Sequence, residues 1–196
     1  KFICFTSKEE LRKSFLTYNS KANNNIVFPY GIGNNSKNIS QKSENDILKI
    51  IYIGRFHKKK NLESVLLAIK DCVRKGIPVK LTLVGQDDSK YSKRILDLKK
   101  KLSINKNLEL IKFTTDNKKM NFYYENDFSI VASFQENFCI SAIESLSMGV
   151  PVIISKNCDL SGDLKNKKIS IDISTDVKSI SSGIMNAYAI KKDKKI

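Results

Sequence analysis

Short apolar runs alternate along the chain with longer segments whose apolar residues recur every three or four positions. The runs 50–53 and 128–132 are short and rich in β-forming residues, which is typical of buried strands. The segment after the first run has the spacing of a helix that packs on one side. This alternation predicts an α/β domain of three layers, with a mainly parallel sheet covered on both faces. The apolar face of that first helix consists of Leu62, Val65, Leu66, Ile69 and Val73.

The same pattern predicts the other elements of the domain. A segment rich in Asn, Ser and Lys at 34–46 is expected to be a solvated loop. The predicted strands are 26–28, 79–84, 108–113 and an edge strand at 169–173, and the predicted helices are 8–18, 91–102, 116–125 and 176–190.

Two carboxylates, Glu136 and Glu144, lie eight positions apart across a strand-to-helix turn. The predicted helix packs through Ile140, Ile143 and Leu146, so one carboxylate follows a strand end and the other lies on the helix. In open parallel sheets, polar ligands bind beyond the carboxyl ends of the strands. The pair therefore marks a candidate ligand site, and two solvated glutamates at a helix end are the alternative.

A second group of polar residues follows the strand at 50–53. Gly54, Arg55 and Lys60 precede a helix that Asn61 can cap. A glycine, a bidentate cation and a lysine at an open helix N-terminus favour an anion, so this stretch is a candidate phosphate site. A basic surface loop is the alternative.

A basic surface loop is the preferred interpretation for Lys58 and Lys59, but not for Arg55 and Lys60. His57 is the only histidine, and no carboxylate stands at a spacing that would orient it for catalysis. We expect no catalytic role for it.

Together, these stretches resemble the C-terminal donor-binding domain of the group 1 glycosyltransferases of family 4, which are retaining enzymes. The resemblance covers about residues 48–155. It rests on Gly-Arg after a strand with a lysine five residues later, Glu-x7-Glu, Gly149-Val-Pro-Val152 and Val84-Gly85. The resemblance implies a Rossmann-like domain, the C-terminal half of a GT-B fold.

The resemblance also implies a role for each candidate residue. Arg55 and Lys60, with Gly54, would hold the donor diphosphate, and Glu136 would lie near the sugar. Glu144 would accept hydrogen bonds from the ribose. Besides this ribose contact, the resemblance implies a catalytic role for Glu136, Arg55 and Lys60. It implies backbone contact with sugar and phosphate for Asn137, Phe138 and Cys139, and base contact for Lys112 and Phe113.

The implied reaction moves a hexose from a nucleotide-diphosphate sugar to a glycan or lipid-linked acceptor. No metal or other cofactor is implied, because two cations and a helix terminus already answer the diphosphate charge. A UDP-sugar is favoured over a GDP-sugar. The acceptor would bind an N-terminal domain that this chain of 196 residues is expected to lack. Residues 1–196 would then be a single nucleotide-sugar-binding domain that binds its donor without turnover.

The chain departs from the family pattern in four places. Asn137 and Cys139 stand where glycines usually flank the phenylalanine after the first glutamate, and glycine permits closer approach of a ligand to the backbone. Ala132 replaces a proline, Tyr30 replaces an asparagine, and no glycine-rich loop follows 151. The replacement of both glycines around Phe138 motivates the alternative of a non-catalytic module that binds nucleotide sugars or serves assembly.

The net charge of +15 comes from 35 basic and 20 acidic residues. Lysines occur in every segment without an aromatic stacking pattern, so nucleic acid is disfavoured as a partner. An anionic membrane surface is a further candidate partner. No apolar run is long enough to span a bilayer. We expect a soluble cytoplasmic protein, with peripheral attachment to the inner face of the membrane as the open alternative.

The four cysteines, Cys4, Cys72, Cys139 and Cys158, show no Cys-x-x-Cys spacing. With one histidine in the chain, a zinc site is disfavoured. We expect small buried thiols in a reducing compartment.

Overall fold

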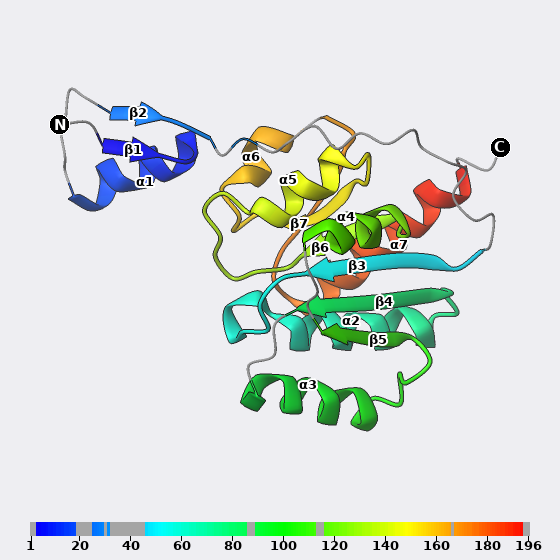
Figure 1. Ribbon diagram of the computed structural model, residues 1–196. Helices are drawn as coiled ribbons and strands as arrows, with labels where there is room; N and C mark the ends of the chain where they lie inside the picture. Colours follow the sequence, from blue (N-terminus) through cyan, green and yellow to red (C-terminus); the bar gives the residue numbers. More distant parts are fainter. Residues whose placement is uncertain are drawn as a thin grey trace.

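The computed structural model describes residues 3–18, 25–29, 31, 46–85, 89–112, 116–165 and 167–193. Its main feature is a six-stranded parallel sheet, ordered β5-β4-β3-β6-β7-β8, with helices on both faces (Figure 1). The predicted three-layer, Rossmann-like α/β fold is confirmed.

The predicted elements are observed within a few residues of their expected bounds, but the strand Val152–Ser155 and the helix Leu160–Leu164 were not predicted. The strand expected at the edge, β8, pairs only with β7 among the described residues. The strands are β1 Ile3–Phe5, β2 Asn25–Val27, β3 Leu48–Ile53, β4 Val79–Gly85, β5 Leu108–Lys112, β6 Phe128–Val131, β7 Val152–Ser155 and β8 Ser170–Ile173. The helices are α1 Lys8–Tyr18, α2 Leu62–Arg74, α3 Ser89–Lys101, α4 Asp116–Tyr124, α5 Ile140–Ser147, α6 Leu160–Leu164 and α7 Val177–Asp193, with a short 3-10 helix, η1, at Lys58–Lys60.

The order of the strands places a ligand crevice between β3 and β6. From β3 the chain proceeds outward through β4 to β5, then returns to β6 and proceeds in the other direction to β8. The chain leaves β3 toward one edge of the sheet and leaves β6 toward the other. The loops after these two neighbouring strands therefore separate at the switch point of the sheet, where such folds bind ligands. Both candidate groups of residues follow these two strands.

The core has one apolar layer on each face of the sheet. On one face, α2, α3 and α7 pack against β3 and β4, with residues such as Leu66, Ile95 and Ile184 fully buried. On the other face, α4 and α5 pack through Tyr123 and Ala142, and α6 lies beside them. The sheet is thus covered by apolar residues on both faces, as the nearly continuous apolar runs of β3 and β6 predict.

Gly85 ends β4 where the chain passes close to the loop after β3. A Cβ at this position would lie 2.2 Å from the carbonyl oxygen of Gly54 and 2.5 Å from the ring of Phe56. Neither the backbone nor a buried ring yields easily, so only glycine fits.

Replacing Gly85 by alanine is therefore expected to lower the free energy of unfolding by about 1–3 kcal/mol, because the added methyl group overpacks this site. Urea denaturation measures the change. Gly162→Ala is the matched control, since a Cβ at Gly162 meets nothing within 4 Å. Equal stability of the two variants would contradict the packing argument.

A smaller unit precedes the main domain. β1 and β2 form a two-stranded parallel sheet with α1 packed on it, and Figure 1 shows this unit in blue, beside the large sheet. The Ser7 hydroxyl accepts a hydrogen bond from the Glu10 N–H at 3.0 Å, which caps α1. Leu16 and Phe28 are exposed on this unit.

Three expectations about the rest of the chain have mixed outcomes. The expected loop at 34–46 and Tyr30 lie outside the described residues, except for Asp46. Cys72, Cys139 and Cys158 are buried, but the prediction of a buried thiol is wrong for Cys4, which is exposed. Within the described ranges, none of the helices has the length and apolar character needed to span a membrane.

Candidate functional site

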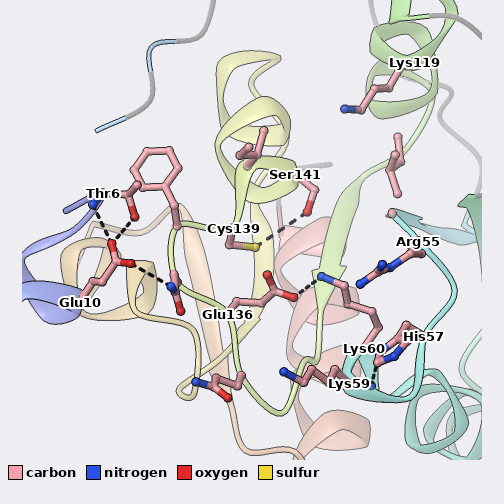
Figure 2. Close-up of a pocket in the computed structure, with 16 residues that line it drawn as sticks. Thr6, Glu10, Arg55, His57, Lys59, Lys60, Lys119, Glu136, Cys139 and Ser141 are labelled. Carbon is pink, nitrogen blue, oxygen red and sulfur yellow. Dashed lines mark hydrogen bonds and ion pairs between the residues drawn. The ribbon is translucent and has the colours of Figure 1, made fainter. Parts of the chain in front are cut away.

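A pocket of about 960 Å³ opens at the carboxyl ends of β3 and β6. It collects residues from four separate parts of the chain (Figure 2). The lining residues are Thr6 and Glu10 from the N-terminal unit, Ile53, Gly54, Arg55, His57, Lys59 and Lys60 after β3, Lys119 from α4, and Gln135, Glu136, Asn137, Phe138, Cys139, Ile140 and Ser141 after β6.

The loop after β3 is held by the buried side chain of Tyr52. Its hydroxyl donates to the Arg55 carbonyl oxygen at 2.8 Å, and a Cβ on Gly54 would lie 2.9 Å from the same hydroxyl. Burial, more than the nearby Glu136 charge, raises the pKa of Tyr52, so it remains a hydrogen-bond donor at neutral pH. The strand end thereby fixes the backbone that carries Arg55.

Arg55 is an exposed cation on the pocket wall, and no described residue forms an ion pair with it. Figure 2 shows its guanidinium directed toward Lys60 and Glu136. Lys60 is different, because its ammonium forms an ion pair with the Glu136 carboxylate. The structure thus brings together three predicted site residues, and it pairs the expected phosphate-binding lysine with the first glutamate.

Asn61 differs from its predicted role. It stands at the start of α2 with φ of 57°, but its side chain makes no capping hydrogen bond. The amide donates instead to the carbonyl oxygens of Ala132 at 3.2 Å and Thr175 at 2.8 Å. Because Ala132 lies just after β6, Asn61 ties the loop after β3 to the loop after β6.

The orientation of α5 corrects the predicted packing face. Ile140 is 47% exposed and lines the pocket, whereas Ala142, Glu144 and Ser145 are buried. Ile143 is only partly buried. The apolar spacing therefore indicated the helix correctly but placed Ile140 on the wrong side, because small and polar residues form much of the buried face.

Glu144 lies behind the pocket wall. Its carboxylate accepts hydrogen bonds from the Lys119 ammonium at 2.6 Å and the Tyr123 hydroxyl at 3.0 Å. The Glu144 and Lys119 side chains are only 11% and 17% exposed. Burial and, secondly, the Glu144 charge raise the pKa of Tyr123. In this structure the second glutamate thus holds α4 against α5, with Lys119 between it and the pocket.

The turn after Glu136 accommodates two side chains where the family usually has glycine. Cys139 adopts φ of 52°, a left-handed conformation that glycine adopts more readily. Its pKa is lowered, chiefly by a hydrogen bond with the Cys158 thiol. Asn137 points toward the N-terminal unit and donates to Glu10 at 3.0 Å. Both side chains are therefore used in packing or hydrogen bonding.

The remaining candidates near β3 and β5 are distributed as follows. His57 lines the pocket, but its Nδ1 accepts a hydrogen bond from the Lys59 N–H at 3.2 Å and so caps η1. Lys59 also lines the pocket, which corrects its interpretation as part of a plain surface loop. Lys112 is exposed at the end of β5 and is not a lining residue. Phe113 lies outside the described residues.

Several lining residues could not be found from the motifs. Thr6 and Glu10 lie far from the other site residues in sequence, and Lys119 lies on a helix with no motif of its own. Ser141 lies within the Glu-x7-Glu segment but carries no distinctive spacing. Across the part of the chain that the structure describes, His, Cys, Asp and Glu side chains form no group of three or more suited to a metal ion.

A parallel α/β domain with cations and a helix N-terminus at its switch point has the features of the class of domains that bind phosphate-containing ligands. Comparison with known proteins makes the class more specific. Residues 34–195 match the family described as glycosyl transferases group 1, and the chain belongs to that family.

Two curated relatives are longer than this chain. The capsular polysaccharide biosynthesis glycosyltransferase CapM of Staphylococcus aureus is 28% identical over 158 residues, which are 74% of this chain and 41% of CapM. The alpha-monoglucosyldiacylglycerol synthase of Streptococcus pneumoniae (strain ATCC BAA-255 / R6) is 27% identical over 118 residues, 60% of this chain and 26% of the synthase. The chain thus spans less than half of either protein.

Solved structures share the fold at low identity. Sucrose-phosphate synthase from Thermosynechococcus elongatus has a TM-score of 0.80 and 21% identity, over 96% of this chain and 49% of that one. Anabaena HepE in complex with UDP has a TM-score of 0.76 and 15% identity, over 98% and 59% of the two chains. The predicted half of a GT-B fold is confirmed.

Proposed function

We propose that this chain is the donor-binding domain of a retaining glycosyltransferase that moves a hexose from a nucleotide-diphosphate sugar to a glycan or lipid-linked acceptor. The observation that carries the proposal is the pocket at the switch point, where Arg55 has no ion-pair partner among the described residues and lies beside Lys60 and Glu136. Family membership supplies the reaction class.

In this proposal Arg55 holds the donor diphosphate through charge-assisted hydrogen bonds. Lys60 shares that anion with Glu136 and stabilises the charge that develops on the departing nucleotide. The first turn of α5 opens onto the same pocket through Ile140 and Ser141. A helix N-terminus favours the distal phosphate, so the proposed site needs no metal ion to neutralise the diphosphate.

Glu136 is assigned to the sugar, with the backbone of Asn137, Phe138 and Cys139 facing the sugar and distal phosphate. Glu144 is assigned to the ribose hydroxyls. Because Lys119 covers that carboxylate, ribose contact requires the lysine to move or to share the carboxylate with the ligand. The base would lie near the end of β5, beside Lys112.

Uridine is the proposed base, ahead of guanosine. HepE, which shares this fold, has been seen in complex with UDP and with UDP and glucose. CapM and the glucolipid synthase indicate two acceptor classes, glycan and lipid. For a lipid acceptor, the net charge of +15 would favour attachment to an anionic membrane surface from the cytoplasmic side.

A thermal-shift titration with UDP, GDP and their glucose conjugates tests the proposal. We expect UDP to raise the melting temperature with a dissociation constant of roughly 10 μM to 1 mM, because a ligand that binds only the folded state stabilises it. Inorganic sulfate at matched ionic strength is the control for nonspecific anion binding. No shift with any nucleotide at millimolar concentration contradicts the proposal.

The second candidate function is a non-catalytic module that binds nucleotide sugars for assembly. Asn137 and Cys139 in place of two glycines favour it, because both side chains occupy the turn that should approach the donor. Nucleotide binding without transfer by the full-length protein would support this alternative.

A further inference from the structure

The backbone of Glu136 is held by the loop that follows β7. Its carbonyl oxygen accepts a hydrogen bond from the Asp159 N–H at 2.9 Å, and its N–H donates to the Asn157 carbonyl oxygen at 3.4 Å. These bonds form an isolated parallel bridge between Glu136 and Cys158. The position of Glu136 therefore depends on where this second loop lies.

Helix α1, which packs on the sheet formed by β1 and β2, contacts both the loop that carries Glu136 and the loop after β7. Glu10 accepts a hydrogen bond from the side chain of Asn137, the residue after Glu136, at 3.0 Å. One turn further along α1, Lys13 forms an ion pair with Asp159. The Asp159 side chain is only 3% exposed, so its charge has lost most of its water and depends on Lys13.

Glu10 is itself fixed in place. Its other carboxylate oxygen accepts hydrogen bonds from the N–H of Thr6 at 2.7 Å and from the Thr6 hydroxyl at 2.6 Å. These contacts, led by the hydroxyl, lower the pKa of Glu10, so it is ionised at neutral pH. Figure 2 shows Glu10 between Thr6 and the loop that carries Glu136.

We propose that Glu10 and Lys13 are positioning residues for Glu136. Helix α1 holds both the loop that carries Glu136 and the loop after β7 that binds the Glu136 backbone, and so sets where the carboxylate meets the sugar of the donor. This inference rests on the proposed function for the sugar contact, but the positioning is a property of the empty protein. It also accounts for Asn137, whose side chain gives Glu10 a partner that glycine could not provide.

The proposal predicts a larger effect on recognition of the sugar than on recognition of the nucleotide. UDP contacts Arg55 and the end of β3, which α1 does not touch through any of the contacts above, whereas the sugar lies at Glu136. Glu10→Gln and Lys13→Met should therefore weaken UDP-glucose binding more than UDP binding. If α1 contributed only to stability, the substitutions would change the affinities for UDP and UDP-glucose by the same factor.

The test compares dissociation constants of UDP and UDP-glucose for the wild type, Glu10→Gln and Lys13→Met. We expect the preference for UDP-glucose over UDP to fall by roughly 5- to 10-fold in each variant, the factor that one lost hydrogen bond produces. Lys13→Arg keeps the charge and should restore most of the preference. Arg12→Met is the matched control: among the described residues its ion pair is with Glu9 on the same helix, and Asp159 acts on it only through a weaker, longer-range charge interaction.

Hydrogen exchange at the Asp159 amide tests the positioning without any ligand. That amide should exchange faster in Lys13→Met than in the wild type or in Arg12→Met, by more than any change shared by the amides of the core strands. Unchanged exchange in Lys13→Met, or an unchanged ligand preference in a wild type that binds both ligands, overturns the inference. Failure of the wild type to bind either nucleotide rejects the proposed function instead, and the exchange result still decides the positioning.

Discussion

Replacing Glu144 by alanine is expected to destabilise the protein by about 3 kcal/mol, because the change leaves a buried ammonium and a buried hydroxyl without their acceptor. Lys119 and Tyr123 both donate to this carboxylate, and all three side chains are largely buried. Urea denaturation followed by circular dichroism measures the change. Sequence reasoning alone places Glu144 on a solvent-facing ligand wall, where the same substitution would cost little.

Glu109→Ala is the matched control for this effect. Glu109 pairs with Lys80 through side chains that are each 46% exposed, so its loss should cost less than about 1 kcal/mol. Similar losses in the two variants would contradict the structural role of Glu144. Glu144→Gln, which keeps an acceptor for Tyr123, is the variant for ribose recognition, and it should reduce the preference for UDP over its 2′-deoxy form.

Replacing Arg55 by alanine is expected to weaken UDP binding by about 10- to 150-fold, since a charge-assisted hydrogen bond contributes about 1.5–3 kcal/mol. Arg55 has no ion-pair partner among the described residues, so its loss leaves no protein carboxylate unpaired. Isothermal calorimetry with UDP gives the affinity, and unfolding experiments should show unchanged stability.

Lys58→Ala removes the same charge three residues away, from an exposed position outside the pocket lining. It should change UDP affinity less than about twofold at physiological salt, because screening weakens a distant exposed charge. If Lys58→Ala and Arg55→Ala weaken binding equally and salt abolishes both effects, the region is a diffuse basic patch and not a specific phosphate-binding site. Lys59 cannot serve as this control, because it lines the pocket.

The sequence predicted the sheet and its helices because their signals are local. β3 and β6 are nearly continuous apolar runs, which only a sheet covered on both faces can bury. The candidate residues Arg55 and Glu136 follow these two strands directly, so the parallel order alone brings them to one crevice. The parallel arrangement and the positions of the motifs after the strand ends were thus sufficient to predict that these two candidate residues lie near one another.

The roles of individual side chains depend on contacts that spacing does not encode. Asparagine commonly caps helices, yet the left-handed backbone of Asn61 directs its amide to the loop after β6. Glu144 is buried because Lys119 and Tyr123 neutralise and satisfy it, and both come from a helix with no motif. Glu10 contacts the site through a hydrogen bond with Asn137, which lies 127 positions away in the sequence. Such long-range polar partners decide burial, and a single sequence does not reveal them.

If the proposed function holds, the ion pair between Lys60 and Glu136 makes nucleotide binding an exchange of counter-ions. A diphosphate that engages Lys60 replaces a carboxylate already in place, so only the difference between two ion pairs contributes to affinity. Once released, Glu136 is a free hydrogen-bond acceptor at the position assigned to the sugar. A bare nucleoside diphosphate leaves that acceptor unused, whereas a sugar-bearing donor supplies hydroxyls for it. In the proposed function, the group that recognises the sugar is thus the partner of the group that binds the phosphate until the donor arrives.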